Sequence, residues 1–429
     1  MALNALSKAA SSMLGKAETS TPIIPQTDAS RPMGALVWKG AKNVEYKSMP
    51  RPLITDTTDI VLRITATTIC GSDLHLYTNA MLDMHTDDIL GHEFMGIIEE
   101  VGSDVKKLQK GQRVVVAFDI ACGKCDYCKR EEYTGCDTTN PSKLMEEMYG
   151  HRTAALFGYS HLTGGTPGGQ ADYVRVPFAD VNCLPLPEDI PDEKGLYLSD
   201  VIPTAYHSCE FGNVQKGSTV AIWGLGPIGL IAARWAQIRG ASRIIGIDCI
   251  PERLRVASEV LKIETLNFKE ENTVKGLFER VPGGVDCALE CAGFEYPNSL
   301  VHKVERALSL ETDTADILSE MITATRKFGN ISIIGVYSGY ANHFPIGALM
   351  EKAITVKGGQ SPTQKYWGMC LEKLRSGEMD PSFILTHRGK LSDAPQLYDQ
   401  FYKREGVIKC FLRPDGIDHH GHPINKDTQ

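Results

Sequence analysis

Short apolar runs separated by turn residues dominate the first part of the chain. They are rich in Val and Ile, are bounded by Gly, Pro or charged residues, and lie at 35–38, 59–66, 94–101 and 113–116. Runs of this length and composition predict strands. A further β run follows Gly168-Gly169-Gln170-Ala171. The hydrophobic pattern therefore predicts a compact β-rich domain that begins near Gly34.

A different pattern begins at Gly217, where a buried strand is followed by apolar residues at helical spacing. The strand is predicted at 217–223 and the helix at 230–236. More apolar runs follow at 243–248, 285–290 and 330–336, with a helical stretch at 319–328. Strands that alternate with helices predict a parallel α/β sheet. After 345 the chain is expected to return to the first domain.

Composition limits the class of protein. The 429 residues exceed what one hydrophobic core usually supports, so two domains are expected. A hydrophobic fraction of 42% and a charged fraction of 23% are ordinary for a soluble protein. The net charge of −8, without a basic stripe, argues against a nucleic-acid partner. No apolar run approaches the roughly 18 residues that a membrane span needs.

The two ends of the chain are predicted to lie outside the fold. Within residues 1–33, Lys8 and Lys16 precede the first acid, which is typical of a mitochondrial transit peptide, but arginine is missing from the first half. We therefore expect a loosely ordered extension and a cytoplasmic protein. Residues 415–429 form a polar tail, and its histidines are interpreted as solvated rather than as a metal site: His419, His420 and His422.

Two short segments gather side chains that bind metals or move protons. One reads Cys-Gly-Ser-Asp-Leu-His from Cys70, and the other reads Gly-His-Glu around His92. Either ligand alone would more often be a buried core residue. Together, with Ser72 and His75 close behind the thiolate, they favour a catalytic zinc with an exit route for a proton.

Four of the 12 cysteines fall within 122–136. Their spacing suits one tetrahedral zinc with no open position, and therefore a structural site: Cys122, Cys125, Cys128 and Cys136. The alternative, two disulfides, would require an oxidising compartment, and nothing else in the sequence indicates one. The crowding of thiols in a long chain favours metal binding in a reducing compartment.

A glycine-rich turn follows the strand at 217–223. It reads Gly224-Leu225-Gly226-Pro227-Ile228-Gly229, and Asp248 ends the next strand. The glycines permit a tight turn, close approach of a pyrophosphate and packing of helix on strand. Asp248 suits the ribose 2′-hydroxyl and would repel a 2′-phosphate, which favours NAD. Arg253 is a complication, because a nearby arginine accepts a 2′-phosphate in other proteins.

These motifs, with Leu-Ser-Asp-Val-Ile-Pro-Thr-Ala-Tyr-His at 198–207, resemble the zinc-dependent medium-chain alcohol dehydrogenases. The resemblance covers 34–414 and is greatest to the glutathione-independent formaldehyde dehydrogenase branch. It implies a GroES-like catalytic domain at 34–205 and 345–414 and a doubly wound Rossmann domain at 206–344. It also implies a homodimer or homotetramer, and extra sequence near the adenine end of the cofactor at 295–314.

The resemblance assigns further site residues. Asp200 becomes the third ligand of the catalytic zinc, although an aspartate here would also suit a helix cap. Glu93 becomes a group close to that metal. The cofactor residues are Gly224, Gly226, Pro227, Ile228, Gly229, Asp248, Arg253, Ala292, Val336, Gly359 and Ser361. The expected cofactors are two zinc ions per chain and NAD.

The implied reaction is hydride transfer between NAD(H) and an alcohol or aldehyde hydrate, with Ser72 taking the hydroxyl proton and His75 passing it to solvent. Alternatives in the same family are a polyol dehydrogenase and a dehydrogenase or ketoreductase of secondary metabolites. A non-catalytic zinc-binding member is disfavoured by Ser72 and His75. A zinc-independent reductase would lack the Cys70 and four-cysteine signals. The sequence leaves the substrate open.

Overall fold

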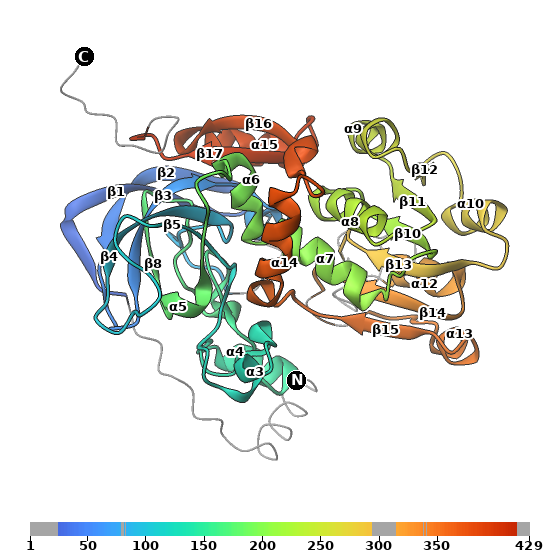
Figure 1. Cartoon of the computed structure of the whole chain (residues 1–429), viewed down its shortest axis with the longest axis horizontal. Helices are drawn as coiled ribbons and strands as arrows, with labels where there is room; N and C mark the ends of the chain where they lie inside the picture. The colour runs from blue at the N-terminus through green and yellow to red at the C-terminus, as the bar shows by residue number, and fades with distance from the viewer. Residues whose placement is uncertain are drawn as a thin grey trace. The chain divides into compact units, whose positions relative to one another are not determined.

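The computed structural model describes residues 25–78, 81, 83–293, 315–337, 339 and 341–417. The chain divides into two compact units (Figure 1). The first comprises Met1–Asp200, Pro362–Arg375 and Leu385–Gln429, and the second comprises Val201–Ser361 and Ser376–Ile384. Within the described residues, every helix is too short or too polar to cross a bilayer.

The first unit is built on a seven-stranded sheet of mainly antiparallel strands. Its order is β16-β17-β3-β4-β5-β9, with β8 paired to β3. The strands are β3 Ile60–Thr67, β4 Phe94–Val101, β5 Arg113–Val116, β8 Tyr173–Val176, β9 Cys183–Pro185, β16 Leu385–Lys390 and β17 Lys409–Arg413. The predicted β-rich first domain is confirmed.

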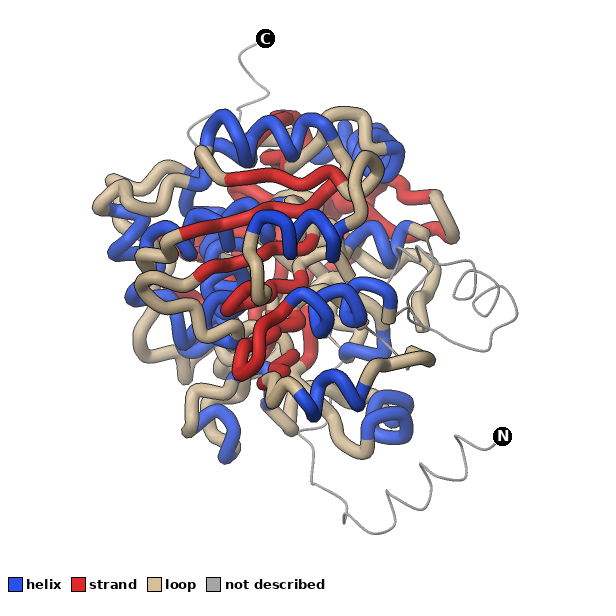
Figure 2. The backbone as a smooth tube through the Cα atoms, turned by 90° about the vertical axis from the view of Figure 1, so that its right-hand side faces the viewer, coloured by secondary structure: helices blue, strands red, loops and turns tan. Residues whose placement is uncertain are grey.

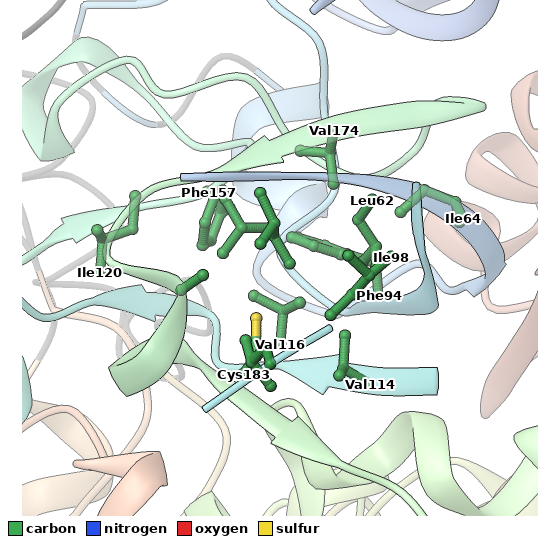
Figure 3. Packing of buried hydrophobic residues seen from close by; sticks show 14 of the residues in the cluster. Leu62, Ile64, Phe94, Ile98, Val114, Val116, Ile120, Phe157, Val174 and Cys183 are labelled. Carbon is green, nitrogen blue, oxygen red and sulfur yellow. The ribbon is translucent and has the colours of Figure 1, made fainter. Parts of the chain in front are cut away.

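Alternate residues of the strands fill the core of this unit (Figure 3). Ile60, Leu62 and Ile64 of β3 belong to one buried cluster, as period-two alternation along a strand requires. Phe94 and Phe157 meet edge to face in it, with ring centroids 5.1 Å apart. Each buried aliphatic or aromatic side chain of this kind stabilises the fold by about 1.5–3 kcal/mol. The packed sheet therefore gives rigid support to the loops at its strand ends.

A hairpin precedes this sheet and corrects one prediction. β1, Thr27–Gly40, pairs antiparallel with β2, Asn43–Pro52, with a register shift between Asp28 and Pro32. Met33 packs in a small buried cluster with Ala35 and Ala171. The predicted extension to residue 33 is therefore wrong for the residues from Thr27 onward. The sequence there shows no apolar run, because the start of β1 is exposed and polar.

The second unit contains a six-stranded parallel sheet in the order β12-β11-β10-β13-β14-β15. Its strands are β10 Thr219–Trp223, β11 Arg243–Asp248, β12 Glu264–Asn267, β13 Val285–Glu290, β14 Thr325–Ile333 and β15 Thr355–Gly358. Numbered along the chain, this is the order 3-2-1-4-5-6 of the doubly wound dinucleotide-binding fold. The predicted Rossmann sheet is confirmed.

Helices cover this sheet; Figure 2 shows the strands in red, edge to edge, with helices in blue beside them. α12, Asp316–Ala324, packs on the face that carries Ala221 and Trp223, and the Trp223 indole donates to Glu320 Oε2 at 3.0 Å. α8, Pro227–Ile238, begins directly after the glycine turn. Gly229 of α8 leaves no space for a Cβ, which would lie 1.9 Å from the carbonyl oxygen of Gly224. Helix and strand are thus in close contact here.

The other helices vary in length from four residues in α3 to 13 in α14. They are α2 Asp73–Tyr77, α3 Asp126–Lys129, α4 Lys143–Tyr149, α5 Ala179–Asn182, α6 Asp192–Gly195, α7 Val201–Phe211, α9 Pro251–Arg255, α10 Thr273–Arg280, α13 Ile346–Glu351, α14 Thr363–Arg375 and α15 Ala394–Lys403. Single turns are η1 Tyr133–Gly135, η2 His161–Thr163, η3 Leu196–Leu198, η4 Val256–Val260, η5 Pro381–Ile384 and η6 Leu391–Asp393, and the remaining strands are β6 Asp119–Ile120 and β7 Ala155–Leu156.

Strand β15 moves the boundary between the units. The sequence predicts a return to the first domain at 345, but β15 pairs with β14 in parallel, so the chain stays in the second unit to Ser361. The chain first passes from the first unit to the second after Asp200, rather than after residue 205 as predicted. The helix predicted at 319–328 ends at Ala324, because the next residues enter β14.

We expect Asp119 in β6 to make the stability of the first unit depend on pH. Its carboxyl group is fully buried and accepts a hydrogen bond from Gln364 Nε2 at 3.1 Å. Burial raises the pKa of Asp119 from 3.8 to about 7. The stabilising contribution of the protonated form is therefore fully present below the unfolded pKa and is lost as the pH rises through about 7.

We expect Asp119→Asn, which stays neutral, to remove this dependence. Between about pH 5.5 and pH 8.5 the free energy of unfolding of the wild type should fall by about 2 kcal/mol relative to that of the variant. Urea unfolding of both proteins across this range measures the difference. Parallel stability profiles would show that the Asp119 carboxyl does not titrate in this window.

Candidate functional site

Four predicted residues form one cluster in the first unit. The ligand atoms of Cys70, His92, Glu93 and Asp200 all lie within 4.8 Å of one another. Cys70 follows the end of β3, and His92 and Glu93 immediately precede β4. Because β3 and β4 are antiparallel, with Thr67 opposite Phe94, the end of one strand lies beside the start of the other. The sheet register thus brings the thiol to the imidazole.

The cluster fits a zinc ion with an open position. His92 Nε2 lies 3.6 Å from Asp200 Oδ2. Nitrogen and oxygen ligands of one tetrahedral zinc, each at about 2.1 Å, stand about 3.4 Å apart. His92, Glu93 and Asp200 are buried, at 4%, 1% and 7% exposure. Sulfur, imidazole and carboxylate in one cluster, of which only Cys70 is partly exposed, are a donor set typical of catalytic zinc.

Asp73 lies beside His92, and sequence reasoning gave it no role. Its Oδ1 lies 3.0 Å from His92 Nδ1, and its Oδ2 accepts the Cys70 N–H at 2.8 Å. A carboxylate on Nδ1 fixes the tautomer that leaves Nε2 for a metal. Gln170, from the predicted Gly-Gly-Gln-Ala segment, donates to Asp73 Oδ2 at 3.4 Å. The signal in the sequence that could have revealed Asp73 is its position directly after Ser72, in the same short segment as Cys70.

The electrostatics of the cluster favour a cation. Burial alone would lower the pKa of His92, but the negative charges of Asp73 and Asp200 outweigh it and raise this pKa well above its ordinary value. Ser72 Oγ lies 3.2 Å from His92 Nε2, so the predicted proton acceptor is beside the cluster. His75 is buried in α2, and its backbone N–H donates to the Ser72 carbonyl at 3.2 Å. A proton route through these two side chains stays a prediction.

Lys409 is the second functional neighbour that the sequence did not reveal. Its ammonium donates to Glu93 Oε1 at 2.5 Å, and the two side chains are 0% and 1% exposed. The ammonium also donates to the Ile69 carbonyl, one residue before Cys70. Burial lowers the pKa of Lys409, but the Glu93 carboxylate outweighs it and raises this pKa. Glu93 is therefore held as an ion pair beside the ligand atoms.

We expect Lys409→Met to destabilise the protein by about 3–5 kcal/mol, because it leaves the Glu93 carboxylate buried without its counter-ion. The double variant Glu93→Gln/Lys409→Met removes both charges and should recover most of the loss. Urea unfolding of the wild type, the single variant and the double variant measures this coupling. A single variant as stable as the wild type would contradict it.

The four cysteines of 122–136 form the second cluster. Cys122 and Cys128 have their Sγ atoms 3.9 Å apart, and so do Cys125 and Cys136. Thiolates at about 2.3 Å from one tetrahedral zinc stand about 3.8 Å apart, whereas a disulfide bond is about 2.05 Å long. All four are free thiols. The geometry is that of a closed structural zinc site, and the disulfide alternative is wrong.

The glycine turn has the local geometry that the motif predicts. Gly224 has a φ of +88°, and a Cβ there would lie 2.9 Å from the Ala292 Cβ. Gly226 caps the N-terminus of α8, with Pro227 in its first turn, and a Cβ at Gly226 would have nothing nearer than an Arg253 nitrogen at 3.9 Å. The N-terminus of α8 is thus open beside the glycine backbone, as an anion site requires.

Predicted cofactor residues share one edge of the parallel sheet. They stand at or shortly after the carboxyl ends of its strands: Gly224, Asp248, Ala292, Val336 and Gly359. The carboxyl edge is where open α/β sheets bind ligands. Buried Glu290, which ends β13, was not predicted; its carboxylate accepts from the N–H groups of Ala292, Gly293 and Gly335 and so joins two edge loops.

The glycine turn holds Asp248, the residue predicted to bind the ribose of the cofactor. Its Oδ2 accepts the Leu225 N–H at 2.7 Å, and Arg253 lies 3.6 Å from the same oxygen. Ser361 is buried, and its Oγ has no hydrogen-bond partner among the described residues. The binding roles of these side chains stay predictions. The extra sequence at 295–314 and the tail histidines lie outside the described residues.

The chain is similar to known proteins along most of its length. A zinc-type alcohol dehydrogenase-like protein of Schizosaccharomyces pombe is 48% identical over 391 residues, which cover 90% of this chain and 92% of that protein. The chain belongs to the zinc-type alcohol dehydrogenase family. Residues 56–188 match the family model for the alcohol dehydrogenase GroES-like domain. The predicted family and the GroES-like fold are thereby confirmed.

Other family members agree with this assignment. The structure of alcohol dehydrogenase TADH from Thermus sp. ATN1 is 32% identical, has a TM-score of 0.74, and covers 89% of this chain and 100% of its own. A glutathione-independent formaldehyde dehydrogenase of Pseudomonas aeruginosa is 32% identical over 409 residues, covering 88% of this chain and 96% of that protein. The formaldehyde dehydrogenase branch is thus related at lower identity than the Schizosaccharomyces pombe protein.

Proposed function

We propose that this zinc-type alcohol dehydrogenase transfers hydride between NAD(H) and a primary alcohol or an aldehyde hydrate. One observation carries the proposal: a partly buried thiol and a buried imidazole and carboxylate, from Cys70, His92 and Asp200, converge in a chain that also has a dinucleotide-type glycine turn. Three protein ligands leave a tetrahedral zinc one position for substrate oxygen, which is the arrangement of catalytic sites.

Different side chains of the cluster have different roles in the proposed reaction. Cys70, His92 and Asp200 would hold the metal with two anions and one neutral ring, and Glu93 would remain at its edge, paired to Lys409. A bound zinc supplies Lewis acidity that favours loss of the substrate's hydroxyl proton. Ser72 takes that proton, and His75 passes it towards solvent. Burial of His92, Glu93 and Asp200 limits the access of competing water.

We propose NAD rather than NADP as the cofactor and a small aldehyde hydrate as one substrate class. The carboxylate of Asp248 would repel a 2′-phosphate. The formaldehyde dehydrogenase relative supports the substrate class, because a hydrated aldehyde is a geminal alcohol that can give up hydride. Homodimeric or homotetrameric assembly and a cytoplasmic location remain further predictions.

A steady-state screen tests the function. The full-length, zinc-loaded protein is offered simple alcohols, polyols and formaldehyde, each with NAD and with NADP, and formation of reduced cofactor is followed. We expect NAD-linked turnover of at least one primary alcohol or of formaldehyde. Turnover of polyols alone would favour the polyol dehydrogenase alternative over a primary alcohol or aldehyde hydrate as substrate. No turnover by fully zinc-loaded protein would support the non-catalytic alternative.

Cofactor choice gives a separate prediction. Asp248→Asn keeps a hydrogen-bond acceptor for Leu225 but removes the charge. We expect kcat/KM with NAD to fall by roughly tenfold or more, because a hydrogen bond to a charged group contributes about 1.5–3 kcal/mol. The ratio of NADP to NAD activity should rise at the same time. An unchanged ratio would show that Asp248 does not discriminate between the two cofactors.

A further inference from the structure

A third cluster of metal-binding side chains lies in the first unit. His85, Asp88 and His161 have ligand atoms that all lie within 4.8 Å of one another. His161 Nε2 is 3.0 Å from Asp88 Oδ1. The two imidazole rings stack, with centroids 3.8 Å apart and an interplanar angle of 26°. None of these residues belongs to the catalytic cluster or to the four-cysteine cluster.

The backbone holds the three side chains together. His161 donates its N–H to the Asp83 carbonyl at 2.9 Å, and His85 donates its N–H to Asp88 Oδ2 at 2.7 Å. Asp87 of the same loop pairs with Lys39 and with a second lysine of the β1–β2 hairpin. The loop at 83–88 is therefore fixed to both η2 and the hairpin, so the ligands need little ordering before they bind an ion.

The donor set selects the class of ion. Two neutral imidazoles and one carboxylate suit zinc, nickel and copper, whereas calcium and magnesium prefer oxygen ligands alone. Asp83 Oδ1 lies 3.2 Å from His85 Nε2, so it can accept that N–H and leave Nδ1 for the metal. The side chains of His85 and His161 are 59% and 32% exposed, which leaves room for water ligands.

We propose that His85, Asp88 and His161 form a third, exchangeable site for a divalent transition metal. The ion would tie the loop at 83–88 to the segment that begins at η2. Two residues before His161, the Tyr159 hydroxyl donates to the Ser72 carbonyl at 3.3 Å, and its ring packs edge-on against His92. Metal at the third site would therefore stiffen a segment in contact with the catalytic cluster.

Calorimetric titration with Ni²⁺ of the full-length protein, already loaded at both zinc sites, tests the proposal. We expect the wild type to bind one Ni²⁺ saturably and His161→Ala to lose this binding. Asp88→Asn should bind Ni²⁺ at least about tenfold more weakly, because a charged ligand is lost. Exposed His151, mutated to alanine, is the matched control and should keep full binding. Zinc content and circular dichroism check that each variant remains folded.

The tail histidines are a competing source of Ni²⁺ binding, so the same titration is repeated on a variant with alanine at His419, His420 and His422. This variant should still bind one Ni²⁺, and adding His161→Ala to it should abolish that binding. Equal binding by wild type and His161→Ala, or loss of all binding in the tail variant, would overturn the proposal.

Discussion

His92→Ala is expected to lower kcat/KM for NAD-linked alcohol oxidation by about a thousandfold or more while the protein stays folded. The imidazole is the neutral ligand of the proposed catalytic zinc, and several kcal/mol of transition-state stabilisation depend on that metal. The content of tightly bound zinc should fall from about two to about one per chain, because the closed four-thiolate site keeps its ion and the proposed third site exchanges its metal. Elemental analysis and steady-state kinetics measure both effects, with His151→Ala as the control.

Asp200 offers a sharper version of this test. Asp200→Asn keeps the shape of the side chain but loses its charge, so metal affinity and activity should both fall. Asp200→Cys replaces one anionic zinc ligand by another. We expect it to retain the second zinc and part of the activity. Full activity of the Asn variant would show that Asp200 is not a ligand.

Cys125→Ser is expected to destabilise the first unit by at least about 3 kcal/mol, since the binding energy of a structural zinc contributes directly to folding. The three partners of Cys125 form a small buried cluster with Ala121 and Ala154, and Cys125 packs against it, so the metal replaces much of a local hydrophobic core. Urea unfolding and zinc analysis measure the loss.

Cys70→Ser is the matched comparison for this prediction. It removes a thiolate from the catalytic cluster, so activity should disappear and one zinc should be lost, with a much smaller change in the free energy of unfolding. Equal destabilisation by the two serine variants would contradict the separate structural role of the four-cysteine site.

Hydrophobic runs with clear boundaries predicted the strands best. β4, β5, β11 and β13 were predicted with both ends, because each is an apolar run closed by turn or charged residues. The start of β1 was missed, because its residues are mostly exposed and polar. They pair only with β2, so they form no apolar run. β15 was assigned to the wrong domain. Its place in the second unit is set by its parallel pairing with β14, and the sequence of a short strand does not indicate which strand it pairs with.

The same contrast holds in the candidate site. Cys70 and His92 were found because thiols and imidazoles at ligand spacing are chemically specific. Asp73, Glu290 and Lys409 were missed, because a single charged residue has no periodicity and its partner is set by the fold. Lys409 reaches Glu93 only because β17 lies beside β3 in the sheet.

Stepwise removal of zinc from the wild-type protein tests the central claim most directly. A chelator should take the accessible catalytic ion before the ion enclosed by four thiolates. NAD-linked alcohol oxidation should then fall in proportion to zinc content, reach zero when about one ion per chain remains, and return when zinc is added back. Undiminished activity in protein that retains only the four-cysteine zinc would contradict the account.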